Sequence, residues 1–299
     1  MKIAKLIYLS CFISVLFFSC QEKKVKEQYT FEDIPSSKLD SINMALASSD
    51  TSKSGIITNA AKGSLWTSFM KTFKDCFQDE TFTKGIIYLG PTNSKYLGAI
   101  LSNDKQITWK SLEKVLNGNE KEMNKFCAPS TNPADNCDKN ELLNNYLGVL
   151  LNGTAQNVDA NLKLAIEDRK SIKMLTGKWR IDEILLGDFN SYMDATKDSA
   201  VIDYKKYLTM KDNFIITKIL VLENFSAEIE SNRKLDAGLQ AELQKGISAP
   251  TASVGADSTR NGVKIGFSNG SNGTIKMNAT GKSYVIGMLQ KVNKIKPKL

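Results

Sequence analysis

The chain has 299 residues, of which 41% are hydrophobic and 24% charged, a composition typical of a globular protein. It contains no histidine, which excludes Ser-His-Asp and Cys-His catalysis, His-ligated zinc or iron, and histidine general bases. The formal net charge is +8, but no dense run of lysine and arginine with interleaved aromatics occurs, so nucleic acid is not an expected partner.

The first residues have the three-part layout of an export signal. Lys2 and Lys5 precede an apolar run, Leu6 to Phe18, that is too short to span a bilayer. A small residue, Ser19, then precedes Cys20, and the chain becomes polar immediately afterwards. The pattern predicts a signal peptide over residues 1–19.

The junction Phe17-Phe18-Ser19-Cys20 resembles the lipobox of bacterial lipoproteins, in a relaxed form similar to that of Bacteroidota. Most lipoboxes carry leucine where this chain has Phe17. The resemblance covers only the signal segment, and it implies cleavage before Cys20 and acylation of the Cys20 sulfur, so that the lipid bilayer is the first expected partner. The alternatives are an ordinary signal peptide in which Cys20 is incidental, or an uncleaved anchor.

The residues after Cys20 bear on localisation. Gln21-Glu22 is followed by Lys23-Lys24 and not by the acidic cluster that Bacteroidota surface lipoproteins usually carry. Aspartate, the inner-membrane retention residue of some other bacteria, is absent at position 21. We therefore expect a lipid-anchored protein of the outer membrane that faces the periplasm.

Residues 20–62 are polar, with Pro35 and a run of small residues from Ala45 to Ser54. Because they offer few large apolar groups, we expect a flexible tether that carries the lipidated Cys20.

Residues 63–177 favour helices. Phe69, Phe73 and Phe77 fall on one face of a helix for which Ser64 is a candidate cap. Further helical patterns run from Thr108 to Leu116, from Asp138 or Asn140 to Leu150, and from Ala160 to Leu175. The region resembles a helical bundle.

Residues 178–299 favour strands. Phe214 to Ile229 predicts a long strand in which Glu223 breaks the alternation, and residues 261–279 predict a β-hairpin around Asn269–Gly273. Leu235 to Ile247 predicts a short helix, and Tyr284 to Val292 predicts a final strand. The expected fold class is α+β, with an N-terminal helical region followed by an antiparallel sheet with a packed helix.

Three cysteines besides Cys20 remain after signal removal. Cys127 and Cys137 flank a short loop of turn-forming residues, and we expect them to form a disulfide that leaves Cys76 free. A Cys76–Cys127 bridge is the alternative, and the spacing of the three matches no common zinc site.

Three functions are compatible with these features. The favoured one is a non-enzymatic envelope lipoprotein that binds a protein or glycan partner, because no catalytic, metal or cofactor motif occurs. The second is a membrane-perturbing, toxin-like protein that uses the amphipathic hairpin at 261–279. The third is a carboxylate-dependent hydrolase, for which Asp182 and Glu183 are the candidate acids.

Overall fold

The computed structural model describes residues 28–35, 37–39, 63–79, 82, 85–92, 95–102, 108–153, 160–233, 236–243, 247–248 and 264–295. The predicted signal peptide, Cys20 and residues 40–62 lie outside the described residues. The labelled elements are, in chain order, β1 (Gln28–Asp33), α4 (Ser64–Phe77), β2 (Ile86–Thr92), β3 (Ile100–Ser102), β4 (Thr108–Lys110), α5 (Leu112–Val115), α6 (Glu120–Met123), β5 (Cys127–Thr131), α7 (Lys139–Gly153), α8 (Ala160–Glu167), β6 (Arg169–Ile184), α9 (Leu186–Ala195), α10 (Ser199–Leu208), β7 (Asn213–Ser231), α11 (Ala237–Leu243), β8 (Ile247–Ser248), β9 (Lys264–Asn269) and β10 (Ile275–Ile295).

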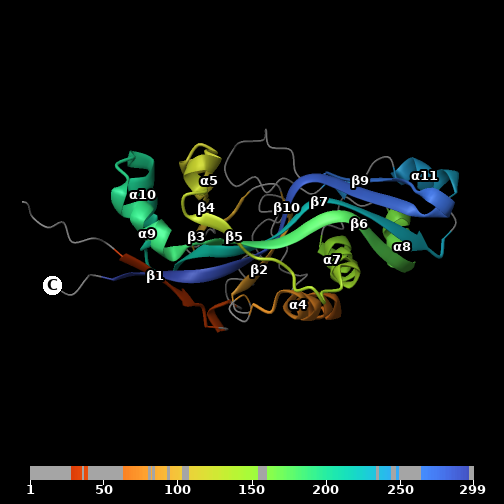
Figure 1. The fold of residues 1–299 in the computed structure, drawn as a ribbon, viewed down its shortest axis with the longest axis horizontal. Coiled ribbons are helices and arrows are strands. Elements are labelled where there is room, and N and C mark those ends of the chain that lie inside the picture. The colour runs from red at the N-terminus through yellow and green to blue at the C-terminus, as the bar shows by residue number, and fades with distance from the viewer. Residues whose placement is uncertain are drawn as a thin grey trace, which may run out of the picture.

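A long, curled antiparallel sheet forms the centre of the molecule (Figure 1). Its two longest strands, β7 and β10, pair with each other along most of their length. The other edge of β10 pairs in succession with β9, β2 and β1, and the other edge of β7 pairs with β6 and then β3. The strands β7 and β10 therefore run along the body and connect its two ends.

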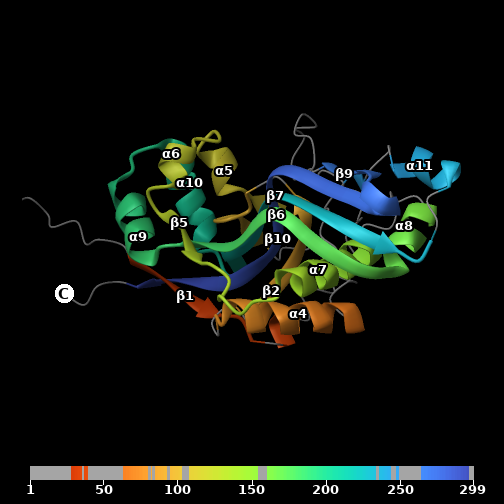
Figure 2. The same ribbon diagram turned by 45° about the vertical axis from the view of Figure 1, so that its right-hand side comes forward.

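Two hydrophobic cores lie on opposite faces of this sheet, because successive residues of a strand point to opposite sides. Leu220 and Leu222 of β7 belong to one core, which α4, α7, α8 and α11 cover. Ile219 and Val221 belong to the other, which α5, α6, α9 and α10 cover. Figure 2 shows α4 and α7 below the sheet and α5, α6 and α10 above it.

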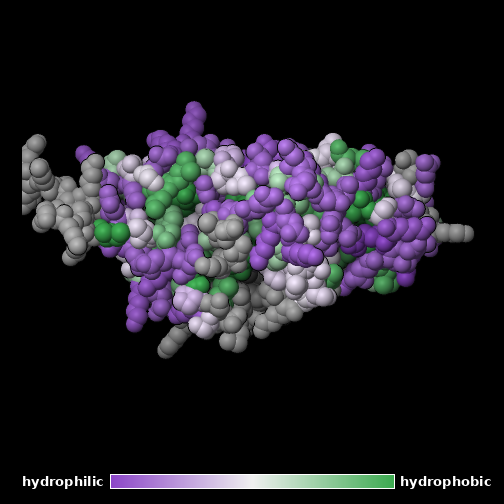
Figure 3. Space-filling view, turned by 60° about the horizontal axis from the view of Figure 1, so that its bottom comes forward, coloured by the Kyte–Doolittle hydropathy of each residue, from purple (hydrophilic) through white to green (hydrophobic). Residues whose placement is uncertain are grey.

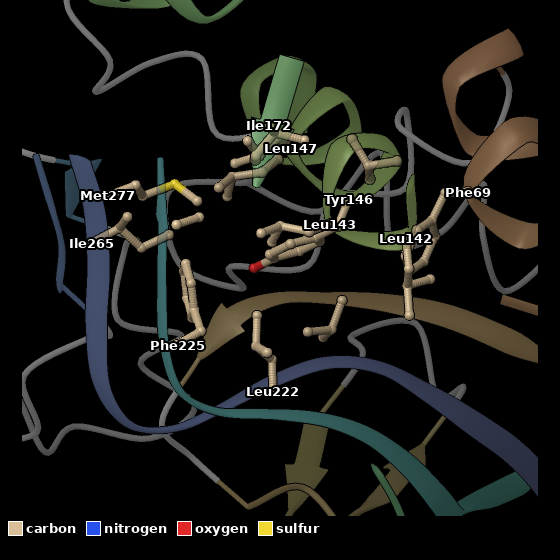
Figure 4. Packing of buried hydrophobic residues seen from close by; sticks show 14 of the residues in the cluster. Phe69, Leu142, Leu143, Tyr146, Leu147, Ile172, Leu222, Phe225, Ile265 and Met277 are labelled. Atoms are coloured by element: carbon tan, nitrogen blue, oxygen red, sulfur yellow. The ribbon is translucent and has the colours of Figure 1, made fainter. Parts of the chain in front are cut away.

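The first core is densely aromatic. Figure 4 shows the Tyr146 side chain of α7 among the apolar side chains that reach it from the sheet and from α4. The Tyr146 and Trp179 rings meet edge to face, with their centroids 5.8 Å apart. Trp179 itself is 1% exposed, so α7 is fixed against β6 by close packing.

The sheet changes character at a line of β-bulges. Gly177, Asn224 and Gly281 all have positive φ, at 133°, 47° and 82°, and the strand registers shift on both sides of β7 at this level. On one side of the line the strands are buried on both faces. We call the other side the distal half-sheet (169–178, 223–231, 264–269 and 275–282). Its apolar residues face the first core, except for the exposed Leu175, and its polar residues face outward.

Several sequence predictions are confirmed. The α+β class occurs. So do the helix that begins at Ser64 (α4), the helix predicted to run to Leu150 (α7) and the long strand over 214–229 (β7). The hairpin over 261–279 is formed by β9 and β10, within the described residues 264–279, and the predicted final strand is the second half of β10. The register break at Glu223 is the bulge at Asn224.

The predicted arrangement of regions is wrong in two respects. Residues 28–33 of the expected tether form β1, because Tyr29 is 2% exposed in the second core and the strand backbone pairs with β10. The expected helical bundle over 63–177 contains strands β2 to β5 and the first half of β6. From Arg169 the chain pairs with β7, and this pairing overrides the helical pattern predicted as far as Leu175.

Candidate functional site

A polar cleft of about 220 Å³ opens between the α5–α6 segment and the middle of β10. Its lining combines side chains of both charges with one phenol. The residues are Lys95, Glu113, Gly118, Glu120, Met123, Lys282 and Tyr284.

Helix caps position the α5–α6 side of this polar cleft. The Ser111 hydroxyl accepts a hydrogen bond from the Lys114 N–H (3.4 Å), and the Asn119 side chain accepts from Lys121 and Glu122 (3.1 and 3.3 Å). Between the two caps the chain turns through Asn117, whose φ is 52°. These caps fix the backbone that presents Glu113 and Glu120 to the cleft.

A buried ion-pair cluster lies beneath the polar cleft. Arg180 Nε donates to Asp182 Oδ1 over 2.8 Å, and Arg180 Nη1 also donates to Glu223 on β7. The Arg180 and Asp182 side chains are only 9% and 8% exposed. One guanidinium thus pairs with two carboxylates in a site with little water, and the cluster keeps a formal charge of about −1.

Tyr284 connects the cluster to the cleft. Burial, followed by the negative charges of Asp182 and Glu113, raises the pKa of the Tyr284 phenol. The phenol therefore stays protonated at neutral pH, and its O–H is available as a hydrogen-bond donor.

The free thiol near the cluster is poorly suited to act as a nucleophile. Cys127 is buried on β5, and burial raises its pKa from 9.0 to about 12, with the Lys95 charge opposing and the Asp182 charge adding to this effect. Thiolate is the nucleophilic form of cysteine, and it is scarce at neutral pH when the pKa is this high.

The proposed acid pair Asp182 and Glu183 is not brought together. The two residues are neighbours on β6 and face opposite sides of the sheet, as strand geometry requires. Asp182 contacts Arg180, whereas Glu183 contacts Lys218, which also pairs with Asp79 (3.3 and 2.7 Å). Their use as a joint catalytic pair is therefore excluded.

The disulfide prediction is also wrong. Cys76 at the end of α4 is bonded to Cys137 before α7, with Cα atoms 4.5 Å apart, and Cys127 is the free cysteine. The Ala134 N–H donates to the Cys76 carbonyl over 2.7 Å, which brings the loop before α7 onto the end of α4. Cys127 faces the second core, away from this contact.

A second, shallower groove of about 430 Å³ lies beside the disulfide, along the start of α7 and residues 174–177 of β6. One of its three charged residues is already engaged, because the Asp138 carboxylate accepts from the N–H groups of Asn140 and Glu141 at the start of α7 (2.9 and 3.0 Å). The polar cleft, with its buried cluster, is the better-built site.

Sequence reasoning did not identify Arg180, Glu223 or Tyr284. One signal was present: Arg180 and Asp182 are opposite charges two residues apart within the apolar stretch Trp179 to Leu186, a spacing that places both on one strand face. Lys95 and Glu113 join them only through tertiary contacts.

Among the described residues, no group of three or more cysteine, aspartate or glutamate side chains could hold a metal ion. Across the same ranges, no helix combines the length and apolarity needed to cross a membrane.

No protein-family model matches the chain, and no curated protein matches its sequence. Among solved structures, the chain is similar to a bacterial gasdermin from Bradyrhizobium tropiciagri at 12% identity. The alignment covers 77% of this chain and 90% of that chain, with a TM-score of 0.35. A likeness at this level carries no conclusion about function.

Proposed function

We propose that the chain is a lipid-anchored, non-enzymatic protein of the cell envelope that binds a partner through the polar cleft. The observation that carries this proposal is the cleft itself, in which two lysines and two glutamates meet beside the cluster of Arg180, Asp182 and Glu223. Helix caps fix the backbone that carries Glu113 and Glu120, and β10 carries Lys282, so little backbone entropy is lost when a ligand pairs with these charges.

The chemistry of the site supports binding over catalysis. Asp182 is occupied by Arg180, Glu183 lies on the other face of the sheet, and the Cys127 thiol stays protonated. Nucleophilic catalysis by cysteine needs a thiolate near neutral pH, which Cys127 does not supply, and the two carboxylates are not placed to act as a pair.

The charge pattern favours a protein partner over a glycan. Lys95 and Lys282 complement carboxylates, whereas Glu113 and Glu120 complement cations, so a peptide segment with charges of both signs fits this lining best. We place this interaction at the outer membrane, on the periplasmic side, with acylated Cys20 as the anchor.

Charge reversal in the polar cleft tests this function. The Glu120→Lys/Lys282→Glu variant and the wild type are used to capture proteins from solubilised envelopes after cross-linking. The matched control is Glu228→Lys/Lys276→Glu, which exchanges a directly cross-strand pair on the outer face of the distal half-sheet. A partner lost only with the cleft variant supports the proposal, and identical capture by all three proteins contradicts it.

A second candidate is membrane perturbation, and the distal half-sheet favours it. The hairpin of β9 and β10 is amphipathic: Phe267 and Met277 are buried, whereas Ser268 and Asn278 on its other face are exposed. Its apolar face is covered by the short helices α8 and α11. Dye release from vesicles by the lipidated chain would support this candidate, and intact vesicles at saturating bound protein would eliminate it.

A further inference from the structure

The folded body begins close in sequence to the proposed anchor. Cys20 and Gln28, the first residue of β1, are eight residues apart, so the fully extended chain between them spans at most about 28 Å. Gln28 pairs with Ile295 at the end of β10. An acylated Cys20 thus restricts this end of the body to the neighbourhood of the bilayer.

The helices at the same end are α9 and α10. The Asn190 side chain of α9 accepts a hydrogen bond from the Tyr29 N–H (2.8 Å) and donates one to the Tyr29 carbonyl (3.1 Å), so α9 lies against β1. Figures 1 and 2 both show α9 and α10 at the end where β1 begins and β10 finishes.

Helix α10 carries apolar side chains on both of its sides. Its inward face is buried in the second core through Val201, Tyr204 and Leu208. On its outward face Ile202 is 41% exposed to solvent. Met210, just after the helix, is 49% exposed. Ile202 and Lys206, four residues apart, form a stripe on one side of the helix, and Met210 follows in the turn beyond the helix end.

We propose that this stripe, together with Tyr207, docks on the lipid bilayer; we call Ile202, Lys206, Tyr207 and Met210 the membrane-facing surface. The inference rests on the proposed lipid anchor. It adds how the folded body is oriented relative to the bilayer. Ile202 and Met210 enter the region below the headgroups, Tyr207 lies at the polar boundary, and Lys206 reaches lipid phosphates. Anionic lipid strengthens the contact because it attracts the positive charge of Lys206.

Two of the neighbouring carboxylates are already engaged, whereas Asp203, beside Ile202 on α10, is exposed. The Asp198 carboxylate is used as the cap of α10, accepting from the Ala200 N–H over 2.8 Å, and Asp212 is paired with Lys38 at 3.1 Å. Lys291 and Lys294 are exposed near the end of β10. The polar distal half-sheet points away from the membrane in this orientation.

The face in Figure 3 is mainly hydrophilic where its residues are coloured, with hydrophobic areas that are small and separate. On this face, contact with lipid is therefore not expected along the length of the body.

Depth-dependent fluorescence tests the orientation. The full lipidated chain is labelled with an environment-sensitive fluorophore at Met210→Cys or Ile202→Cys, and at Asn278→Cys on the distal half-sheet as the matched control. Each protein is placed in vesicles of phosphatidylcholine with phosphatidylglycerol, with and without spin-labelled acyl chains. The buried Cys127 thiol is not expected to take up label.

We expect the fluorescence at positions 202 and 210 to be quenched severalfold more strongly than at 278, and more so with phosphatidylglycerol than without it. Equal quenching at all three positions overturns the orientation. Mass analysis of the Cys20 peptide separates the two proposals. Acylated Cys20 without quenching overturns the docking surface alone, and unmodified Cys20 overturns the anchor and the inference together.

Discussion

Arg180 is the residue on which the floor of the polar cleft depends most. It is the shared cation of Asp182 and Glu223, and burial of the cluster makes each unpaired carboxylate unfavourable. Glu223 is 26% exposed and can be hydrated if its partner is lost, whereas Asp182 is 8% exposed and cannot. The two carboxylates therefore respond differently to the removal of Arg180.

Replacing Arg180 tests this asymmetry. We expect Arg180→Met to lower the free energy of unfolding by about 3 kcal/mol, because Asp182 keeps a buried charge without a partner. The double variant Arg180→Met/Asp182→Leu removes that charge and should recover most of the loss. Urea unfolding of both variants measures the difference, and equal stabilities would show that the pair does not act as described.

Alkylation probes the Cys127 thiol. At pH 8, iodoacetamide should leave Cys127 unmodified in the native protein and modify it in urea, because the folded pKa of about 12 leaves little thiolate. The raised pKa also makes stability depend on pH. The protonated thiol contributes to the free energy of unfolding below its ordinary pKa of 9.0, and this contribution is lost as pH rises toward 12. Rapid native labelling seen by peptide mass analysis would contradict the burial.

At the scale of elements, Asn224 holds three strands together at the line of bulges. Its side-chain oxygen accepts from the Gly281 N–H of β10 over 2.8 Å, and its carbonyl accepts from the Thr176 hydroxyl of β6 over 3.4 Å. Its φ of 47° lies in the left-handed region, where asparagine is tolerated and β-branched residues are strained.

Two substitutions at this position separate backbone conformation from hydrogen bonding. Asn224→Gly keeps access to positive φ and loses only the side-chain bond, so we expect a loss of about 1 kcal/mol in the free energy of unfolding. Asn224→Val adds the backbone strain, and we expect about 2–3 kcal/mol in total. Chemical denaturation distinguishes them, and a valine variant as stable as the glycine variant would refute the role of the bulge.

The disulfide stabilises the contact between α4 and α7 by closing a long loop. With a sequence separation of 61 residues, Cys137→Ser should lower the free energy of unfolding by about 2–4 kcal/mol. Reductant supplies the control: it should lower the melting temperature of the wild type and leave that of Cys137→Ser unchanged. An effect of reductant on both proteins would assign the stabilisation elsewhere.

The elements that could be predicted are those whose own periodicity is strong. The aromatic spacing of α4 and the alternation in β7 and the β9–β10 hairpin determine their structure locally. Strand β1 could not be predicted, because within it only Tyr29 is buried and its stability comes from pairing with β10.

Disulfide partners and the cleft were not predictable for a related reason. The pairing of Cys76 with Cys137 depends on how α4 approaches α7, and no local pattern records that distance. The polar cleft joins Lys95, the α5–α6 segment and β10, which are far apart in sequence. The α+β class, α4, the long strand β7 and the position of the hairpin follow from the sequence without tertiary contacts.

At the scale of the whole molecule, the long strands connect two ends with different surfaces. One end contains the start of β1, α9, α10 and the membrane-facing surface, and the other contains the polar distal half-sheet (Figure 1). The polar cleft lies near the middle of β10, between them. An anchored body in the proposed orientation presents the cleft above the bilayer, accessible to a partner in the periplasm.

The acylation of Cys20 is the claim on which the anchor, the localisation and the orientation all depend. Metabolic labelling with an alkyne-bearing palmitate, followed by capture and immunoblot, tests it directly in growing cells. The wild type and Cys11→Ser, which alters a signal-peptide cysteine, should both be labelled, and Cys20→Ser should not. Label retained in Cys20→Ser, or absent from the wild type, would contradict the account.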